Sequence, residues 1–584
     1  MSYRKGDDMA TRNITGNPSQ IIVEQLAASG VKYVFYNSGS REANFFDALH
    51  ANPDVNGILG LHEGSVTAMA GGYTQVNGDP AVTVVHLGAG LAQCMGQLIN
   101  VWTGGLPLVI ITFAGDTGSF ADKIGLDLSH SFGPTSISAP LTKENWTVVE
   151  PEGLPIAIDR AIRVAKTPSQ GPVHIALYDK LLGNQQVKSS LIEDGDLGLI
   201  AGYPADRDLE QLARYLHQAE RPLLYIGDGV WKSKAESLVT NLAEHYGANV
   251  ANTFDDLRGV SIKHPLQCGR LEQVISTIEP DLIVAIGARH MGAGYPQDYD
   301  IFSKVKHMVA VGSHSDNFKN LPGLELAVLG DERRSLERLL EMIASESQPK
   351  RYDERRQEAR KRAETLRSDR RQRLQSKAPQ KGVVPELAVL DTMDTALEKL
   401  GGGLITIEQF AVPPDCVKSS DDTGHNVYIR PAGGSEGYGV GAAIGAKLAA
   451  PDRPVVGLVG DGSLYYADSA LWTAAHHNIP VLYIIPNNQA YGIVANAFGL
   501  AHGEMDKTGI YEGVLLDGID PVKISEAFGV EAMDVKEESD IGKAIDHGLS
   551  VTGKEGRPFL LNVHVPVGLP SGGKGATPFK LANP

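Results

Sequence analysis

The chain has 584 residues, a formal net charge of −17 and 42% hydrophobic residues. This length exceeds the usual limit of one hydrophobic core, so two or more domains are expected. The negative charge argues against nucleic acid as the main partner, because it repels phosphate backbones. Three widely spaced cysteines in no metal-ligand pattern favour a reduced compartment over a disulfide framework. Residues 1–18 form a polar extension without the apolar core of a signal peptide, and no stretch has 18 uninterrupted apolar residues, so we expect a cytoplasmic protein with no membrane span.

Short β-rich runs alternate with helical patterns in the first part of the chain, which we predict to be a domain of residues 19–190. This alternation is typical of a parallel sheet with crossover helices. The predicted strands are residues 32–36, 57–61, 81–85 and 107–112, and the clearest helices are residues 64–75 and 93–102.

A second alternating set predicts a small doubly wound domain over residues 200–345, with strands at 223–226 and 282–286. The first of these strands ends in Gly227-Asp228-Gly229. Because the third glycine of a dinucleotide fingerprint is missing, a tight turn is the favoured interpretation, and an adenine nucleotide site is the alternative. Residues 346–381 are dense in interspersed acids and bases, which predicts an exposed, charged helical linker and argues against a nucleic-acid arm.

The last predicted domain, residues 382–584, contains one βαβ unit with unusual polar residues at its strand ends. Residues 455–459 and 481–485 are buried-strand patterns on either side of a predicted helix at 466–476. A right-handed crossover makes the two strands parallel, so Asp461 and Asn488 both emerge at carboxyl ends, where open α/β sheets bind ligands. The two side chains can therefore share one ion.

Magnesium suits such a site, because it prefers oxygen ligands and is commonly held by one or two protein oxygens together with phosphates. Gly460 and Gly462 let the backbone approach a diphosphate, and we expect Ser463 to begin a helix whose free N–H groups attract anions. For the Gly-Asp-Gly tripeptide alone, a strand-to-helix turn with Ser463 as N-cap is an equal alternative. The motif Gly460-Asp461-Gly462-Ser463, then 23 residues, then Asn487-Asn488 favours the anion site.

This spacing resembles the metal–diphosphate anchor of thiamine diphosphate enzymes, and other segments extend the resemblance over most of the chain. Tyr36-Asn37-Ser38-Gly39-Ser40 and Leu61-His62-Glu63 resemble two active-site segments of the family of benzoylformate decarboxylase and acetolactate synthase. The run from His86 through Met95-Gly96 and Asn100 to Trp102 is similar to benzoylformate decarboxylase. The resemblance implies three doubly wound α/β domains with parallel sheets, which are pyrimidine-binding, central and diphosphate-binding in that order. It implies thiamine diphosphate and Mg²⁺ as cofactors.

The resemblance also implies roles for single residues. Glu63 promotes the imino form of the cofactor's pyrimidine from a neighbouring subunit, His86 handles protons, and Ser40 orients a substrate carboxylate. A helix-terminal charge, a buried structural histidine and a turn-shaping serine are the respective alternatives. The implied metal ligands are Asp461, Asn488 and Ala490, and the implied cofactor-binding residues are Glu63, Gln409, Gly437, Gly462, Ser463 and Asn488.

Two segments depart from the family pattern. Before Gly437 the family has a bulky apolar residue, whereas this chain has Ser435-Glu436, so either the register slips by one residue or a carboxylate lies near the reaction centre. The hydroxyls that some relatives offer the diphosphate are absent from Glu408-Gln409-Phe410, where backbone groups could substitute.

The predicted function is a non-oxidative lyase or carboligase that makes or breaks a C–C bond next to a carbonyl, with a 2-oxo acid decarboxylase or carboligase favoured. The expected partners are a small 2-oxo acid, aldehyde or acyl-CoA substrate and further copies of the chain, as a homodimer or homotetramer with active sites at the subunit interface. One alternative is a 2-hydroxyacyl-CoA lyase, suggested by the tail 568–584. The others are a flavin-containing acetolactate synthase and a catalytically silent thiamine-binding subunit.

Overall fold

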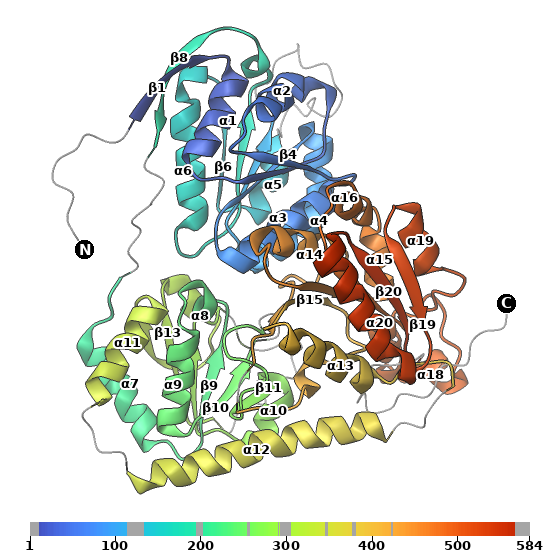
Figure 1. The fold of residues 1–584 in the computed structure, drawn as a ribbon. Coiled ribbons are helices and arrows are strands. Elements are labelled where there is room, and N and C mark those ends of the chain that lie inside the picture. Colours follow the sequence, from blue (N-terminus) through green and yellow to red (C-terminus); the bar gives the residue numbers. More distant parts are fainter. Residues whose placement is uncertain are drawn as a thin grey trace.

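The computed structural model describes residues 11–113, 134–193, 202–253, 257–289, 291, 305–344, 349–376, 381–421 and 424–566. Three six-stranded parallel sheets, each covered by helices, confirm the predicted fold class. They lie in three separate parts of the molecule (Figure 1). Among the described residues, no helix is long and apolar enough to cross a membrane. Residues 1–10 and the tail 568–584 lie outside the described residues.

The N-terminal sheet has the strand order β3-β2-β4-β5-β7-β6. The four strands predicted here are confirmed to within two residues at each end. Helix α4 (Leu87–Thr103) begins six residues earlier than predicted, because Gly88 and Gly90 weaken the helical pattern at its start. The strands are β2 (Tyr33–Tyr36), β3 (Asn56–Leu59), β4 (Ala81–Val85), β5 (Leu108–Thr112), β6 (Glu144–Val148) and β7 (Val173–Leu177), and the other main helices are α1 (Pro18–Ala28), α2 (Ala43–Ala51), α3 (Glu63–Asn77) and α6 (Leu154–Lys166).

Part of the predicted N-terminal extension is ordered structure. Strand β1 (Thr11–Gly16) pairs antiparallel with β8 (Val187–Ile192), which lies at the C-terminal end of the same domain. Most residues of β1 are polar or exposed, so the sequence pattern alone does not show a strand there. Residues 11–16 therefore belong to the N-terminal domain.

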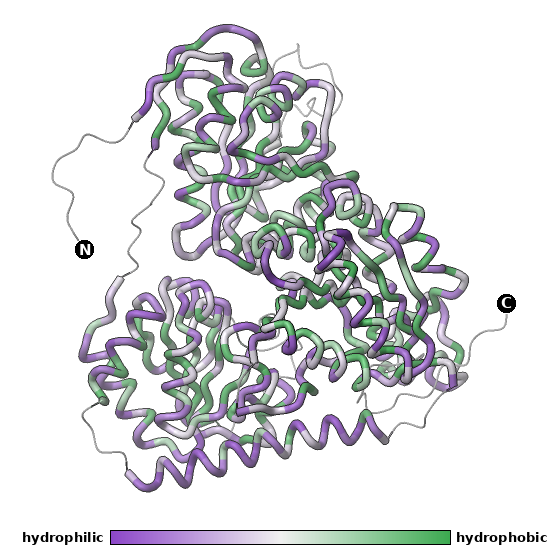
Figure 2. The backbone as a smooth tube through the Cα atoms, in the orientation of Figure 1, coloured by the Kyte–Doolittle hydropathy of each residue, from purple (hydrophilic) through white to green (hydrophobic). Residues whose placement is uncertain are grey.

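The central sheet has the order β11-β10-β9-β12-β13-β14. Both strands predicted here are confirmed, and in Figure 2 they form part of the hydrophobic interior of this domain. The strands are β9 (Pro222–Ile226), β10 (Asn249–Asn252), β11 (Gln267–Arg270), β12 (Leu282–Ile286), β13 (His307–Gly312) and β14 (Leu324–Leu329), and the main helices are α7 (Asp206–Gln218), α9 (Glu236–Tyr246), α10 (Leu271–Ile278) and α11 (Glu332–Ile343).

The charged linker is one long helix, α12 (Lys350–Gln375), as its composition predicted. It is hydrophilic along much of its length, yet it runs alongside the central domain toward the C-terminal domain (Figure 2). The predicted exposure holds for most of this helix, but one side of it is covered, because Ala359 and Ala363 are buried and the Arg367 side chain is only 2% exposed. Small residues and arginine stems let this charged helix pack closely.

The C-terminal sheet has the order β16-β15-β17-β18-β20-β19. The predicted helix at 466–476 is two helices, α15 (Asp461–Ala467) and α16 (Ala470–His476), and Gly460 is the N-cap of the first. Ser463 is therefore neither the first residue nor the N-cap. The strands are β15 (Leu404–Glu408), β16 (Val427–Ile429), β17 (Val455–Val459), β18 (Leu482–Asn487), β19 (Glu531–Val535) and β20 (Phe559–His564), and the other main helices are α13 (Glu386–Lys399), α14 (Gly439–Ala449), α17 (Gly492–Leu500) and α20 (Glu538–Ser550).

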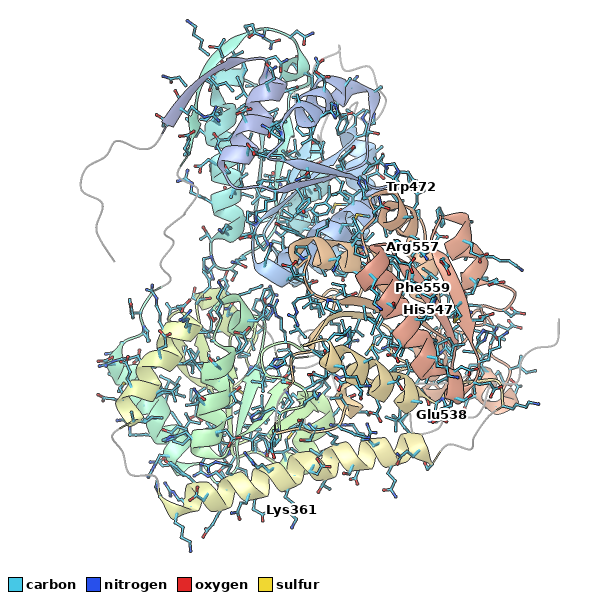
Figure 3. All side chains as sticks on the ribbon, viewed as in Figure 1. Lys361, Trp472, Glu538, His547, Arg557 and Phe559 are labelled. Atoms are coloured by element: carbon cyan, nitrogen blue, oxygen red, sulfur yellow. The ribbon has the colours of Figure 1, made fainter. Side chains whose placement is uncertain are left out.

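Helix α20 covers one face of this sheet, where His547 meets the ring of Phe559 edge-on at 5.2 Å between centroids (Figure 3). The other face carries α14, which packs on α3 of the N-terminal domain at two glycine contacts. A Cβ atom at Gly445 would lie 1.8 Å from the carbonyl oxygen of Met69, and one at Gly72 would lie 2.1 Å from that of Ala442. Only glycine allows this approach, which fixes the two domains against each other.

Candidate functional site

A pocket of about 320 Å³ lies at the carboxyl edge of the C-terminal sheet. Strands β15, β17 and β18 end there, so the residues just after them meet although they are far apart in sequence. The pocket brings together six of the residues predicted from the sequence. They are Gln409, Asp461, Gly462, Ser463, Asn488 and Ala490.

Asp461 is the buried carboxylate of this pocket. It is 2% exposed, and among the described residues no hydrogen-bond donor reaches its Oδ2 atom. Burial raises the pKa of this carboxyl to about 6, although nearby backbone N–H groups partly oppose the shift. A buried carboxylate oxygen without a donor is costly unless a cation binds it. Asp461 therefore fits a divalent metal ion.

Asn488 lies opposite on the loop after β18. Its side-chain oxygen accepts a hydrogen bond from the Ala490 N–H at 3.2 Å, and the Ala490 carbonyl accepts one from Gly492 at 2.9 Å. Each oxygen has a second lone pair for an ion. Asn487 instead binds Asn562 at 3.1 Å and does not line the pocket, so only the second asparagine of the pair faces it.

The first turn of α15 presents backbone N–H groups beside Asp461. A Cβ atom at Gly462 would lie 2.7 Å from the ring of Tyr491, so any other residue would require this ring to move. The unpaired backbone N–H groups at a helix start attract phosphate oxygens. The Ser463 hydroxyl donates a short hydrogen bond to the Glu436 carboxylate, so its proton is already engaged by a negative charge.

Of the two predicted cofactor-binding residues Gln409 and Gly437, only Gln409 lines the pocket. Gln409 lines the pocket, but its side chain closes its own loop through hydrogen bonds with the backbone of Val412 at 2.7 and 2.8 Å. Gly437 lies at the pocket's edge with φ of +91°, a conformation that favours glycine, and a Cβ atom there would lie 2.8 Å from the Cβ of Tyr466.

Glu436 lines the pocket directly. Its loop is held by two side chains of α4 from the N-terminal domain. Gln97 donates to the Glu436 carbonyl at 2.6 Å, and Asn100 donates to the Ser435 carbonyl at 2.8 Å and accepts from the Gly433 N–H at 2.9 Å. The carboxylate is therefore positioned by contacts from both domains.

Glu408 is a buried carboxyl beside the pocket residue Gln409, and the sequence did not single it out as a candidate site residue. Its carboxyl oxygens accept hydrogen bonds from the N–H groups of Tyr438 at 2.9 Å and Gly439 at 2.6 Å, at the start of α14. Burial and the nearby Glu436 charge raise the pKa of Glu408 to about 8, despite these backbone bonds. The sequence does contain a signal for this residue, which is a glutamate at the end of a fully buried strand.

His86 and Ser40 lie at the carboxyl edge of the N-terminal sheet, outside the pocket. His86 is the N-cap residue of α4, and its Nδ1 atom lies 2.9 Å from Glu42, whose side chain is only 1% exposed. A Cβ atom at Gly39 would lie 2.0 Å from this nitrogen, so the glycine makes room for the ring. Ser40 is exposed and begins the short helix that contains Glu42. Glu42 was not identified from the sequence, although a carboxylate just after a strand end was a usable signal.

Glu63 is the first residue of α3 and is 7% exposed. A Cβ atom at Gly90 would lie 3.0 Å from its carboxylate, which therefore lies against the first turn of α4. Neither Glu63 nor His86 lines the pocket that contains Asp461 in the same chain.

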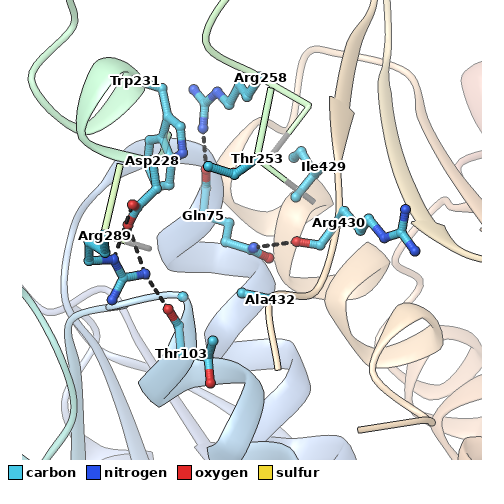
Figure 4. Close-up of a pocket in the computed structure, with 11 residues that line it drawn as sticks. Gln75, Thr103, Asp228, Trp231, Thr253, Arg258, Arg289, Ile429, Arg430 and Ala432 are labelled. Atoms are coloured by element: carbon cyan, nitrogen blue, oxygen red, sulfur yellow. Dashed lines mark hydrogen bonds and ion pairs between the residues drawn. The ribbon is translucent and has the colours of Figure 1, made fainter. Parts of the chain in front are cut away.

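The glycine turn of the central domain is occupied by ion pairs within that domain, and its cations also donate hydrogen bonds to the N-terminal domain (Figure 4). The Asp228 carboxylate lies 3.0 Å from Arg289 and also pairs with Lys232. Burial alone would raise the pKa of Asp228, but these cations outweigh it and leave the pKa below its ordinary value. Arg289 also donates to the Thr103 carbonyl (Figure 4), which supports a structural turn at Gly227-Asp228-Gly229.

Comparisons with known proteins agree with this arrangement. Models of the thiamine pyrophosphate enzyme N-terminal TPP binding domain, central domain and C-terminal TPP binding domain match residues 17–130, 209–339 and 421–563. Benzoylformate decarboxylase of Pseudomonas aeruginosa is 29% identical over 92% of this chain and 97% of its own. Acetolactate synthase isozyme 1 large subunit of Escherichia coli is 26% identical over 96% and 95%.

A solved structure, the thiamine diphosphate-dependent 4-hydroxybenzoylformate decarboxylase of Rhodococcus jostii RHA1, aligns with a TM-score of 0.75 and 26% identity, covering 94% of this chain and 99% of that one. The three matched models follow one another in the order of the three sheets. The fold, the metal-suited pocket and these matches together lead to one conclusion: this chain belongs to the family of thiamine pyrophosphate-dependent enzymes related to benzoylformate decarboxylase and acetolactate synthase.

Proposed function

We propose that the protein uses thiamine diphosphate and Mg²⁺ to make or break a C–C bond next to a carbonyl without net oxidation, with a 2-oxo acid as the substrate. The observation that carries this proposal is Asp461, a buried carboxylate with an orphaned oxygen beside Asn488 and the start of α15. A cation and a diphosphate would complete this site, because each satisfies groups that the protein leaves open.

The residues that would hold the cofactor follow from this geometry. Asp461, Asn488 and the carbonyl of Ala490 would bind Mg²⁺, while the N–H groups of Gly462 and Ser463 would bind the diphosphate. When bound, thiamine diphosphate supplies a nucleophilic carbon and an electron sink for the bond next to the carbonyl. We also propose the domain limits 19–190, 200–345 and 382–584, with the strand of residues 11–16 added to the first domain and residues 346–381 as the linker.

The proton-handling groups lie in the N-terminal domain. We assign to Glu63 the hydrogen bond to the pyrimidine, to His86 the exchange of a proton with the substrate oxygen, and to Ser40 the substrate carboxylate. Glu42 holds the His86 ring through Nδ1, which leaves Nε2 for the substrate. These groups and Asp461 line different surfaces of one chain, so the complete site would need a second copy.

Exposed apolar side chains support this assembly. Large hydrophobic residues of this single chain are exposed on α4, α15 and α17 and just before α3, which are the elements that carry the site. Such residues are typical of subunit interfaces. They include Leu61, Ile99, Trp102, Tyr466, Ile493 and Val494.

The substrate class is argued from the relatives and from the pocket. The similar proteins include two 2-oxo acid decarboxylases by name, which favours decarboxylation over acyl-CoA cleavage. The ion pairs at Gly227-Asp228-Gly229 give no support to a flavin or adenine nucleotide there. The tail that suggested a 2-hydroxyacyl-CoA lyase lies outside the described residues. The three free, buried cysteines fit a reducing compartment, and we propose the cytoplasm.

Complementation between two inactive variants tests the proposal. Glu63→Gln and Asp461→Ala should each abolish turnover of 2-oxo acids. In a symmetric dimer with shared sites, half of the randomly mixed dimers contain one intact site, so mixing should restore about a quarter of wild-type activity. Continued inactivity of the mixed sample would refute the shared site, and wild-type activity of Glu63→Gln would refute the role of Glu63. Lack of cofactor- and Mg²⁺-dependent turnover of any 2-oxo acid by the wild type would favour a catalytically silent subunit.

A further inference from the structure

A second, larger cavity of about 810 Å³ lies between the central domain, α12 and the C-terminal domain. Its volume is in the range of cavities that bind small organic ligands. The ends of β10 and β11 form one wall, α12 another, and the segments after β15 and β16 the third. Representative lining residues are Asn252, Gln267, Arg270, Arg370, Phe410 and Arg430.

This cavity adjoins the pocket that contains Asp461. Gln409, Phe410 and Ile493 line both cavities, so the two cavities share one wall. A molecule that places its reacting carbon beside the cofactor could therefore extend its other end into the larger cavity.

The lining of the larger cavity is rich in positive charge. Five arginines and three acidic residues line it, whereas the whole chain carries a net charge of −17. A positive cavity in an acidic protein concentrates field lines and attracts anions selectively. The eight residues are Arg270, Arg367, Arg370, Arg373 and Arg430 with Glu272, Asp369 and Asp415.

Two of these arginines are structural. Arg367 donates to the Ile262 carbonyl at 3.0 Å, and both terminal nitrogens of Arg370 donate to the Cys268 carbonyl at 3.0 Å. Each also has an acidic partner, because Arg367 lies 3.5 Å from Glu364 and Arg370 lies 3.6 Å from Asp415. Burial nevertheless lowers the pKa of Arg367, and a nearby anion would relieve this cost.

Arg270 and Arg430 line the cavity from different domains. The guanidinium of Arg430 lies over the ring of Phe410 at 4.7 Å, and Phe410 is a shared wall of the two cavities. Arg270 ends β11 in the central domain, where its Nε atom forms a long ion pair of 4.0 Å with Glu272. Guanidinium groups bind carboxylates and phosphates through paired hydrogen bonds.

We propose that this arginine-lined cavity binds a second anionic group of an elongated substrate, remote from the carbonyl that reacts. The inference rests on the proposed function and deepens it, because it names the substrate class as acids with a distal carboxylate or phosphate. Arg270 and Arg430 are the specificity-determining residues.

Matched substrate pairs test this inference on the cofactor-loaded enzyme. The first pair is 2-oxoadipate against 2-oxohexanoate, and the second is a 2-hydroxyacyl-CoA against the N-acetylcysteamine thioester of the same acid. The member with the distal anion should have at least a tenfold higher kcat/KM in one pair, which also distinguishes a carboxylate from a phosphate. Arg270→Ala and Arg430→Ala should each lower that value roughly 10- to 100-fold, mainly through KM, as expected for lost hydrogen bonds to a charged group. Turnover of the neutral member should stay unchanged.

Arg333→Ala is the matched control, because it removes the same charge from an exposed site on α11. It should leave both members of each pair unaffected. Arg430→Lys should recover part of the loss, since lysine keeps the charge but not the paired geometry. Equal kcat/KM within both pairs, or equal losses for both members in the arginine variants, would overturn the inference while leaving the proposed function intact.

Binding provides a readout that does not need turnover. Titration calorimetry of the cofactor-loaded protein should show uptake of glutarate or ADP, no uptake of glutaramide or adenosine, and loss of the signal in Arg270→Ala. No uptake of either anion would overturn the inference. Turnover of no substrate at all would instead count against the proposed function, and the calorimetry would still decide whether the cavity binds anions.

Discussion

In the N-terminal sheet the third strand in chain order, β4, ends just before His86, whereas in the C-terminal sheet the third strand, β17, ends just before Gly460 and Asp461. The two sheets have the same strand order, and helices α3 and α14 follow the second strand of each. One topology thus presents a histidine paired with a buried glutamate at one edge and a carboxylate suited to a metal at the other. The shared topology determines where a site can form, at the carboxyl ends of the strands. The few side chains that follow the strands determine the chemistry of each site.

Removing the metal-suited side chain should give the largest effect. We expect Asp461→Ala to lose roughly 10³-fold or more in turnover, because a bound metal stabilises charge by several kcal/mol. Calorimetric titration with Mg²⁺ and thiamine diphosphate should show the matching loss of binding. Wild-type affinity in this variant would show that the two sheet edges do not differ as described.

Removing the histidine at the corresponding edge should affect the chemistry but not cofactor binding. We expect His86→Ala to lose roughly 10²-fold in kcat, the usual scale for a lost acid–base group. Glu42→Gln should cause a smaller loss, because the ring stays but loses its charged partner. Reduced cofactor affinity with unchanged kcat in His86→Ala would contradict this division of roles.

Acidic pH should weaken metal binding at the C-terminal edge. The pKa of Asp461 is about 6 in the cofactor-free protein, and only the deprotonated carboxylate binds a cation. Affinity for Mg²⁺ should therefore be constant above about pH 7 and fall about tenfold by pH 5. Titrations across this range measure the slope, and Asp461→Asn should bind weakly without it.

The contact between α3 of the N-terminal domain and α14 of the C-terminal domain can be disrupted by adding one methyl group. Gly445→Ala forces a methyl group onto the Met69 carbonyl and should destabilise the protein by about 1–3 kcal/mol. Thermal unfolding of Gly553→Ala is the control, because nothing lies within 4 Å of a Cβ atom there. Equal melting temperatures for the two variants would mean that the α3–α14 contact is loose.

The smallest expected effect concerns Glu436. Its charge helps to raise the pKa of Glu408 to about 8, above the ordinary value of a glutamate, so Glu408 holds a proton in the folded protein that the unfolded chain releases. Stability should therefore decline as pH rises from about 4.5 to 8. Glu436→Gln should reduce this decline in the cofactor-free protein, as melting temperatures at pH 5.5 and 8 would show. An unchanged pH dependence would show that the Glu436 charge does not affect the pKa of Glu408.

The sequence pattern predicted the buried strands well, because continuous apolar runs such as 455–459 have few alternatives. It also predicted that Asp461 and Asn488 meet, since a βαβ unit has one favoured hand. It did not show the start of α4, where glycines hide the helical pattern, or the break between α15 and α16. Glu42 and Glu408 escaped detection because their importance comes from burial among distant segments. The cavity of Arg270 and Arg430 likewise forms only when the central and C-terminal domains are placed together.

Helix α4 touches all three domains. His86 is at its beginning, Gln97 and Asn100 hold the Glu436 loop near its middle, and Lys232 donates to the carbonyls of Gly104 and Gly105 just past its end at 2.7 and 2.9 Å. Each residue inserted into a helix rotates the remainder of that helix by about 100° and advances it by about 1.5 Å. A single insertion anywhere between His86 and Gln97 would thus turn the Gln97 amide away from the Glu436 loop. The number of residues between these two positions is therefore constrained more tightly than the identity of those residues.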